Sequence, residues 1–282
     1  MTTKLTDDLE FQEPGISAQA LFFLGLALTA GTIAAATLLP TWLPNLATSM
    51  LGSEAKVYWY LSRGTALVSF GLLWLSMMLG LAITNHLARV WPGGPTAFGI
   101  HEYTSILGLG FGLFHGLILM GDRYINYTLM QVLLPFASVN YRPVWVGLGQ
   151  VAFYFWGLLV ISFYIRKRIG TKTWRLIHYA SFFTFLMVFI HGVTSGTDTS
   201  TPWAQWMYWI SGSSLLFLLF YRVLFNVKLL SRPSKQAGVP TRRPQPSSQK
   251  PLNLGAPGHG RLGAQTSDSD GTSGIAEAGG FD

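Results

Sequence analysis

Six long stretches without a charged residue constrain the fold of this 282-residue chain more than any other feature. A helix that crosses the hydrocarbon core of a bilayer, about 30 Å thick, needs about 20 mostly apolar residues because each residue adds about 1.5 Å. The stretches are Gly15–Leu39, Gly64–Asn85, Tyr103–Gly121, Val144–Ile165, Leu176–Thr197 and Thr199–Tyr221. The sequence therefore predicts an all-α fold, a six-helix transmembrane bundle.

The composition agrees with a membrane protein and excludes several other classes. Half of the residues are hydrophobic and 11% are charged, whereas about 25% are charged in an average soluble domain. The formal net charge of +7 is spread over the chain without a basic stripe on a foldable domain, so no nucleic-acid partner is expected. The absence of cysteine excludes disulfides, Cys-ligated zinc, iron–sulfur clusters and thiol catalysis.

The chain divides into three parts. Residues 1–14 form an acidic leader, which is expected in the cytoplasm and is unlike the basic start of a signal peptide. Residues 15–230 form the membrane domain. Residues 231–282 are rich in Pro, Gly, Ser and Gln and are predicted to be a disordered tail. A further apolar run, Tyr127–Val139, is too short to span the bilayer and is interpreted as a surface or re-entrant piece.

The short loops predict the orientation of the bundle. The loop between the fourth and fifth segments carries five basic residues, whereas the loop between the fifth and sixth carries none. These basic residues are Arg166, Lys167, Arg168, Lys172 and Arg175. The positive-inside rule places this loop in the cytoplasm, and six spans then place both termini there too. We expect an integral, multi-pass protein of the plasma (inner) membrane.

Four of the six histidines fall as two pairs inside the predicted spans. His101 and His115 are on the third segment, and His178 and His191 are on the fifth. Ionisable side chains are costly in a bilayer and usually mark a function. The third and fifth segments run in the same direction, so His101 is level with His178 and His115 with His191. The result is two layers of paired imidazoles, which suit two haem irons with two axial histidines each.

The helical phase fits one segment better than the other. Fourteen residues return to within about 40° of the starting face of a helix, which suits His101 and His115. Thirteen residues miss by about 140°, so the segment with His178 and His191 is expected to be bent, to be locally rewound, or to present its ligands from different directions.

The local sequence around these histidines resembles the ferric reductase-like transmembrane domain, over about residues 20–228. The matching motifs are the W-R-x-x-H of Trp174–His178, Phe114-His115-Gly116 and Ile190-His191-Gly192. That family includes ferric reductases, NADPH oxidases and the haem membrane subunit of the methionine sulfoxide reductase system. The resemblance implies two stacked b-type haems that pass electrons across the membrane.

The resemblance also implies an oxidoreductase component that depends on partners. Family members usually continue into cytoplasmic FAD- and NAD(P)H-binding domains, and no flavin site is evident in this chain. The electron donor is then a separate flavoprotein or a quinol. The acceptor could be a ferric chelate, oxygen, a quinone or a partner reductase.

Two arginines are further candidates for haem binding. Arg63 is expected at the start of the second segment, and Arg175 lies one turn before His178. A guanidinium can bind a haem propionate through two hydrogen bonds, and contact with lipid headgroups is the alternative.

Two other functions remain open from sequence alone. The histidines could line a proton or metal path in a haem-free protein, which requires water-accessible imidazoles. The chain could also be a non-catalytic membrane anchor for partner proteins.

Overall fold

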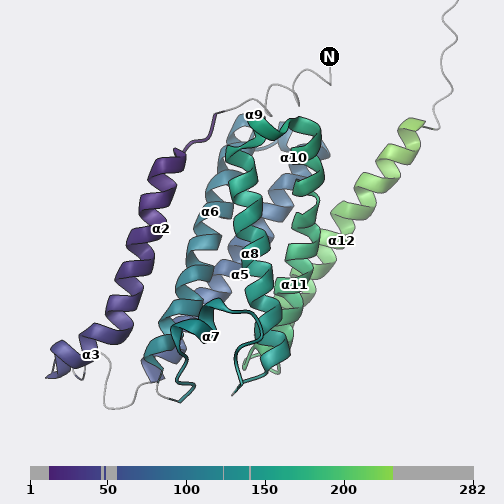
Figure 1. The fold of residues 1–282 in the computed structure, drawn as a ribbon. Helices are drawn as coiled ribbons and strands as arrows, with labels where there is room; N and C mark the ends of the chain where they lie inside the picture. The colour runs from purple at the N-terminus through teal and green to yellow at the C-terminus, as the bar shows by residue number, and fades with distance from the viewer. Residues whose placement is uncertain (1–12, 46–47, 49–55, 123, 140, 231–282) are drawn as a thin grey trace, which may run out of the picture. The chain divides into compact units, whose positions relative to one another are not determined.

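The computed structural model describes residues 13–45, 48, 56–122, 124–139 and 141–230, and within those residues it is helical without a β-strand (Figure 1). The helices of the first half are α2 (Ala18–Ile33), the π-helical η1 (Ala34–Leu38), α3 (Leu39–Trp42), α5 (Lys56–Thr84), the short η2 (Leu87–Arg89), α6 (Gly94–Ile118) and η3 (Leu119–Gly121). Those of the second half are α7 (Leu129–Leu133), α8 (Pro143–Tyr164), α9 (Arg166–Ile169), α10 (Thr171–His178), α11 (Ala180–Ser195) and α12 (Pro202–Leu230).

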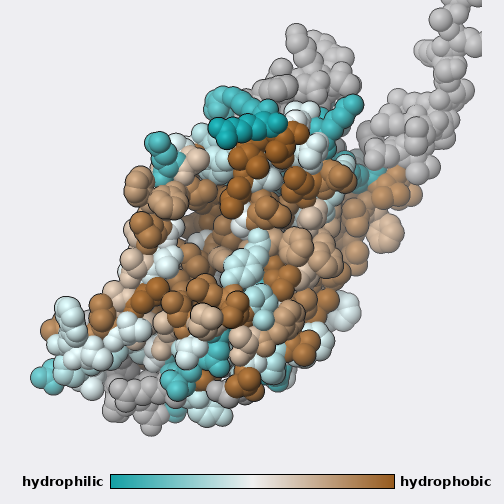
Figure 2. Space-filling model, viewed as in Figure 1, coloured by the Kyte–Doolittle hydropathy of each residue, from teal (hydrophilic) through white to brown (hydrophobic). Residues whose placement is uncertain are grey.

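The predicted fold class is confirmed. In the part of the chain that the structure describes, six helical stretches are long and apolar enough to cross a bilayer, which makes this a multi-pass membrane protein. Hydrophobic side chains cover the sides of the helices, and hydrophilic ones gather at the end that carries α9 (Figure 2). The predicted disordered tail and most of the predicted leader lie outside the described residues.

Several helices begin earlier than the charge-free stretches do. The second span begins at Lys56, so Arg63 lies two turns inside α5 and not at its start as expected. The third span begins at Gly94, where Gly93 ends the preceding turn at φ 103° and Pro95 occupies the first turn. The difference arises because the absence of charge marks only the hydrocarbon core, whereas a helix continues into the interface.

Four helix–helix contacts account for most of the packing in the described bundle. The most extensive contact joins α5 to α6; α8 packs on α11, α2 on α6 and α12 on α5. Phe70, Trp156, Phe185 and Leu218 come from α5, α8, α11 and α12 and share one buried cluster. The helices α6 and α11 are not among the closely packed pairs, so the space between them is open to side chains.

The start of α2 is tied to the basic end of the bundle. The buried carboxylate of Glu102 accepts a hydrogen bond from the backbone N–H of Gly15 at 2.9 Å. Glu13 forms an ion pair with Lys167, and this partner lowers the pKa of the Glu13 carboxyl. These contacts fix where the chain enters its first span.

The apolar run Tyr127–Val139 does not span, as predicted. It contains the five-residue α7, whose first turn is closed by a capping box between Thr128 and Gln131. Side chains of α8 satisfy the carbonyls of its last turn: Gln150 Nε2 donates to Gln131 and Val132 at 2.7 Å each, and the Tyr154 hydroxyl donates to Leu133. The run is therefore fastened to α8.

The fifth span is interrupted at Tyr179, between α10 and α11. Tyr179 has φ −61° and ψ −22°, and Phe182 donates to its carbonyl at 3.2 Å, three residues back. These are features of a 3₁₀ turn, which advances each residue by about 120° and not about 100°. Each residue wound in this way reduces the phase mismatch of His178 and His191, about 140°, by about 20°, so local rewinding accounts for part of the mismatch.

Candidate functional site

The four histidines meet as the two predicted pairs. The ring centres of His101 and His178 are 6.1 Å apart, and those of His115 and His191 are 6.4 Å apart. The ring planes cross at 74° and 69°. Each pair joins α6 to the α10–α11 span, although neither α10 nor α11 is among the helices that pack extensively on α6.

The α5 backbone orients both imidazoles of α6. His101 Nδ1 lies 2.8 Å from the carbonyl oxygen of Ser76, and His115 Nδ1 lies 2.9 Å from that of Ser62. A carbonyl oxygen can only accept, so each contact is a hydrogen bond when Nδ1 carries the proton; the hydroxyls of Ser76 and Ser62 lie 3.0 and 2.8 Å from the same two nitrogens. In a neutral imidazole the other nitrogen, Nε2, is then free to bind a metal, and a second partner of this kind commonly orients metal-binding histidines.

Three serines, seven residues apart on α5, lie along the contact between α5 and α6. Ser62, Ser69 and Ser76 are buried, and seven-residue steps along α5 match seven-residue steps back along α6 from His115 through Gly108 to His101. In the middle of the row, the Ser69 hydroxyl donates to the carbonyl of Gly108 at 2.8 Å. The two layers therefore share one antiparallel register.

His191 is oriented in the same way by α8. Its Nδ1 donates to the carbonyl of Trp145 at 2.8 Å. That carbonyl points along the helix toward Gly149, where a Cβ would lie 2.5 Å from His191 Nδ1. Only a residue without a side chain leaves room for the ring there. His178 packs instead against Trp174, with ring centres 5.2 Å apart.

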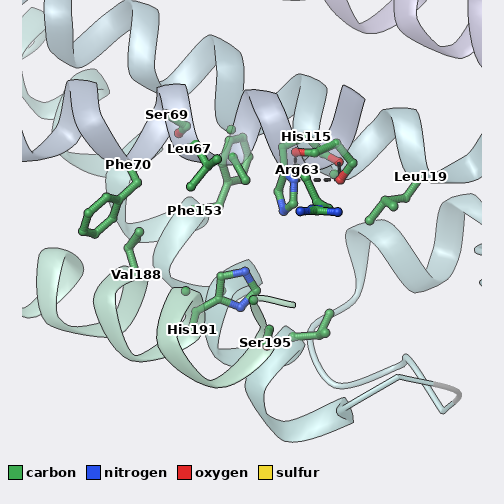
Figure 3. A pocket seen from close by; sticks show the side chains of 18 of the residues that line it. Arg63, Leu67, Ser69, Phe70, His115, Leu119, Phe153, Val188, His191 and Ser195 are labelled. Atoms are coloured by element: carbon green, nitrogen blue, oxygen red, sulfur yellow. Dashed lines mark hydrogen bonds between the residues drawn. The ribbon is translucent and has the colours of Figure 1, made fainter. Parts of the chain in front are cut away.

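Each pair lines its own cavity. The His115–His191 cavity has a volume of about 260 Å³, and the His101–His178 cavity about 520 Å³. Small-molecule sites commonly measure about 300–1,000 Å³, so the second falls within this range and the first just below it. Figure 3 shows His115 and His191 approaching the first cavity from different helices, with Arg63 beside His115. Trp156 lines both cavities and so lies between the layers.

The two predicted arginines line different cavities. Arg175 lines the His101–His178 cavity and Arg63 the His115–His191 cavity. In the structure Arg63 binds Asp198 bidentately: Nε donates to Oδ2 at 3.0 Å and Nη2 donates to Oδ1. Sequence reasoning missed Asp198, although Asp122 and Asp198 are the only acidic residues between Glu102 and the end of α12.

One further histidine lines the His101–His178 cavity. His86 follows α5 in a left-handed conformation, at φ 63°. Its pKa is lowered by burial and by the nearby charges of Arg89 and Arg222. It is unpaired with another imidazole in the described bundle and lies at the edge of the site.

Each layer offers two imidazole donors, the number that a haem iron would need. Within the described ranges, no cluster of three or more His, Cys, Asp or Glu side chains could hold a metal, whereas protein-bound metal ions commonly have three or four protein ligands. A haem iron needs two axial ligands. Because a metal–imidazole bond is about 2 Å and the ring nitrogen lies about 1.1 Å from the ring centre, two axial imidazoles would have centres about 6.2 Å apart. The observed separations match this value.

Comparison of the chain with protein-family models, curated proteins and solved structures finds no match. The ferric reductase-like resemblance therefore depends on the histidine spacing and the short motifs around it.

Proposed function

We propose that the protein is a transmembrane b-type cytochrome that passes electrons across the membrane through two bis-histidine haems. The observation that carries this proposal is the pair of imidazole separations, 6.1 and 6.4 Å. The two layers are separated along α6 by fourteen residues, or about 21 Å of helix rise. Two such layers would place one redox centre near each face of a hydrocarbon core about 30 Å thick.

The chain supplies the binding and the orientation. A haem supplies one-electron redox chemistry when it is bound, and the protein tunes its potential through ligands, burial and hydrogen bonds. The carbonyls of Ser62, Ser76 and Trp145 hold three of the imidazoles in one tautomer. The walls of both cavities are mostly apolar. Arg63 and Arg175 are positioned to attract haem carboxylates, Arg63 in competition with Asp198.

A difference spectrum tests the proposed function. Protein purified after expression with ample haem should contain about two non-covalent b-type haems per chain, because no cysteine can attach them covalently. The measurement is a dithionite-reduced-minus-oxidised spectrum together with the haem-to-protein ratio. A colourless preparation would contradict the proposal and favour a haem-free proton or metal path.

A single methyl group at Gly149 should disturb the His115–His191 layer. In Gly149→Ala the Cβ meets His191 Nδ1 at 2.5 Å, so the ring must move away from the Trp145 carbonyl. We expect the haem-to-protein ratio to fall from about two toward about one. Gly157→Ala, on the same helix with no heavy atom within 4 Å, is the matched control and should keep both haems. Equal ratios in the two variants would contradict this role of Gly149.

The orientation and partners belong to the same proposal. The basic loop around α9 favours the cytoplasm for the end with His101 and His178, in a plasma (inner) membrane with both termini cytoplasmic. Electrons then enter from a separate flavoprotein or a quinol and leave toward a ferric chelate, oxygen, a quinone or a partner reductase. The chain would serve as the membrane component of an oxidoreductase.

A further inference from the structure

The indole nitrogen of Trp174 is buried without a hydrogen-bond partner in the part of the chain that the structure describes. An indole N–H can only donate, and a buried donor of this kind normally has a partner. Trp74 on α5 behaves in the usual way, since its Nε1 donates to the Ser214 hydroxyl at 3.0 Å. No acceptor among the described residues binds the Trp174 N–H, so its partner is expected to be a bound molecule.

The position of Trp174 relates this donor to the His101–His178 cavity. Its side chain lines that cavity, and its ring lies 5.2 Å from the ring of His178, with the planes inclined at 31°. The two residues are four positions apart on α10, so Trp174 lies about 6 Å, or one helical turn, from His178 toward the end with α9. The second buried atom of this kind among the described residues, Ser195 Oγ, lies four positions beyond His191 and lines the other cavity.

The charges around Trp174 favour an anion. Arg175, its neighbour in the chain, lines the same cavity. Arg222 lines it as well, so two guanidinium groups stand against one carboxylate, that of Glu102, which accepts the Gly15 N–H. An acceptor with a negative charge would be stabilised by the Trp174 N–H and by the nearby guanidinium groups.

We propose that Trp174 binds a haem carboxylate through its Nε1–H in the His101–His178 cavity. This inference depends on the proposed function and adds a residue that fixes which edge of the haem faces the end with α9. A haem b carries its two carboxylates on one edge, and Trp174, one helical turn from His178 and lining the same cavity, would hold that edge toward the end with α9. The carboxylate is the acceptor that the indole lacks.

The test compares haem with its dimethyl ester, in which both carboxylates are blocked. The full-length His191→Ala variant, expected to keep only the His101–His178 site, is the parent, and Trp174→Phe is added to it. The phenyl ring retains the packing against His178 but removes the N–H. Because a hydrogen bond to a charged group is lost, we expect haem affinity to fall by about tenfold or more, with little change for the ester. Trp206→Phe, whose ring is exposed and lines neither cavity, should bind both as the parent does.

Three other outcomes would contradict either the carboxylate contact or the proposed function. If Trp174→Phe weakens haem and ester equally, Trp174 acts only by packing against His178, and the carboxylate contact is wrong. If it weakens neither, the contact is also wrong while the proposed function stands. If the parent and the wild-type protein bind no haem, the proposed function fails and this inference fails with it.

Discussion

His101→Ala and His178→Ala should each remove one haem from the purified protein, and it should be the same haem. The two rings are 6.1 Å apart in one cavity, so loss of either ligand leaves an iron with a single protein bond. The double variant should therefore lose no more than either single variant. His115→Ala and His191→Ala should share the loss of the other haem in the same manner.

Variants that mix the layers provide the decisive comparison. His101→Ala combined with His191→Ala should remove both haems, whereas His101→Ala combined with His178→Ala should leave one. Haem stoichiometry and a redox titration distinguish these results, because the remaining haem of each single variant has its own potential. His259→Ala, in the C-terminal segment outside the described residues, is the control and should keep both haems. Different haems lost from His101→Ala and His178→Ala would refute the pairing.

The pairing was predictable because it depends on periodicity and topology. Charge-free stretches of about 20 residues indicate spans, and two spans separated by one other must run in the same direction. This alone placed His101 level with His178 and His115 level with His191. Six spans and two histidine layers are thus properties that local composition and spacing determine, without knowledge of side-chain contacts.

The features that sequence reasoning missed depend on contacts between segments far apart in the chain. The phase of His178 and His191 indicated an irregularity in the fifth span, but its position was missed, because no glycine or proline marks Tyr179. The partner of Arg63 lies 135 residues away, at Asp198. The serines at 62, 69 and 76 did carry a signal, since polar residues repeated every seven positions on a span indicate a face turned toward another helix.

Two glycines leave space for imidazole rings beside a helix backbone. Gly149 and Gly80 each follow by four positions a residue whose carbonyl accepts from a histidine, Trp145 and Ser76 respectively. A Cβ at Gly80 would lie 3.4 Å from the His101 ring, which is tight but less severe than the 2.5 Å at Gly149. Two of the three imidazoles that lie on a helix carbonyl therefore have a glycine four positions further on, whereas Ala66 occupies the corresponding position beside His115. No single-residue propensity indicates which of these positions needs a glycine.

Transmembrane electron flow should require both layers at once. We expect each of the four single histidine-to-alanine variants to stop it almost completely, because one remaining layer leaves most of a core about 30 Å thick without a redox centre. Full-length protein in sealed vesicles, with ferricyanide trapped inside and dithionite added outside, allows the rate of ferricyanide bleaching to be measured. His259→Ala should bleach as the wild type does. A single-layer variant that retained the wild-type rate, with its one haem confirmed by spectrum, would mean that electrons do not pass through the stacked pairs, and the proposed path across the bundle would be wrong even though haem binds.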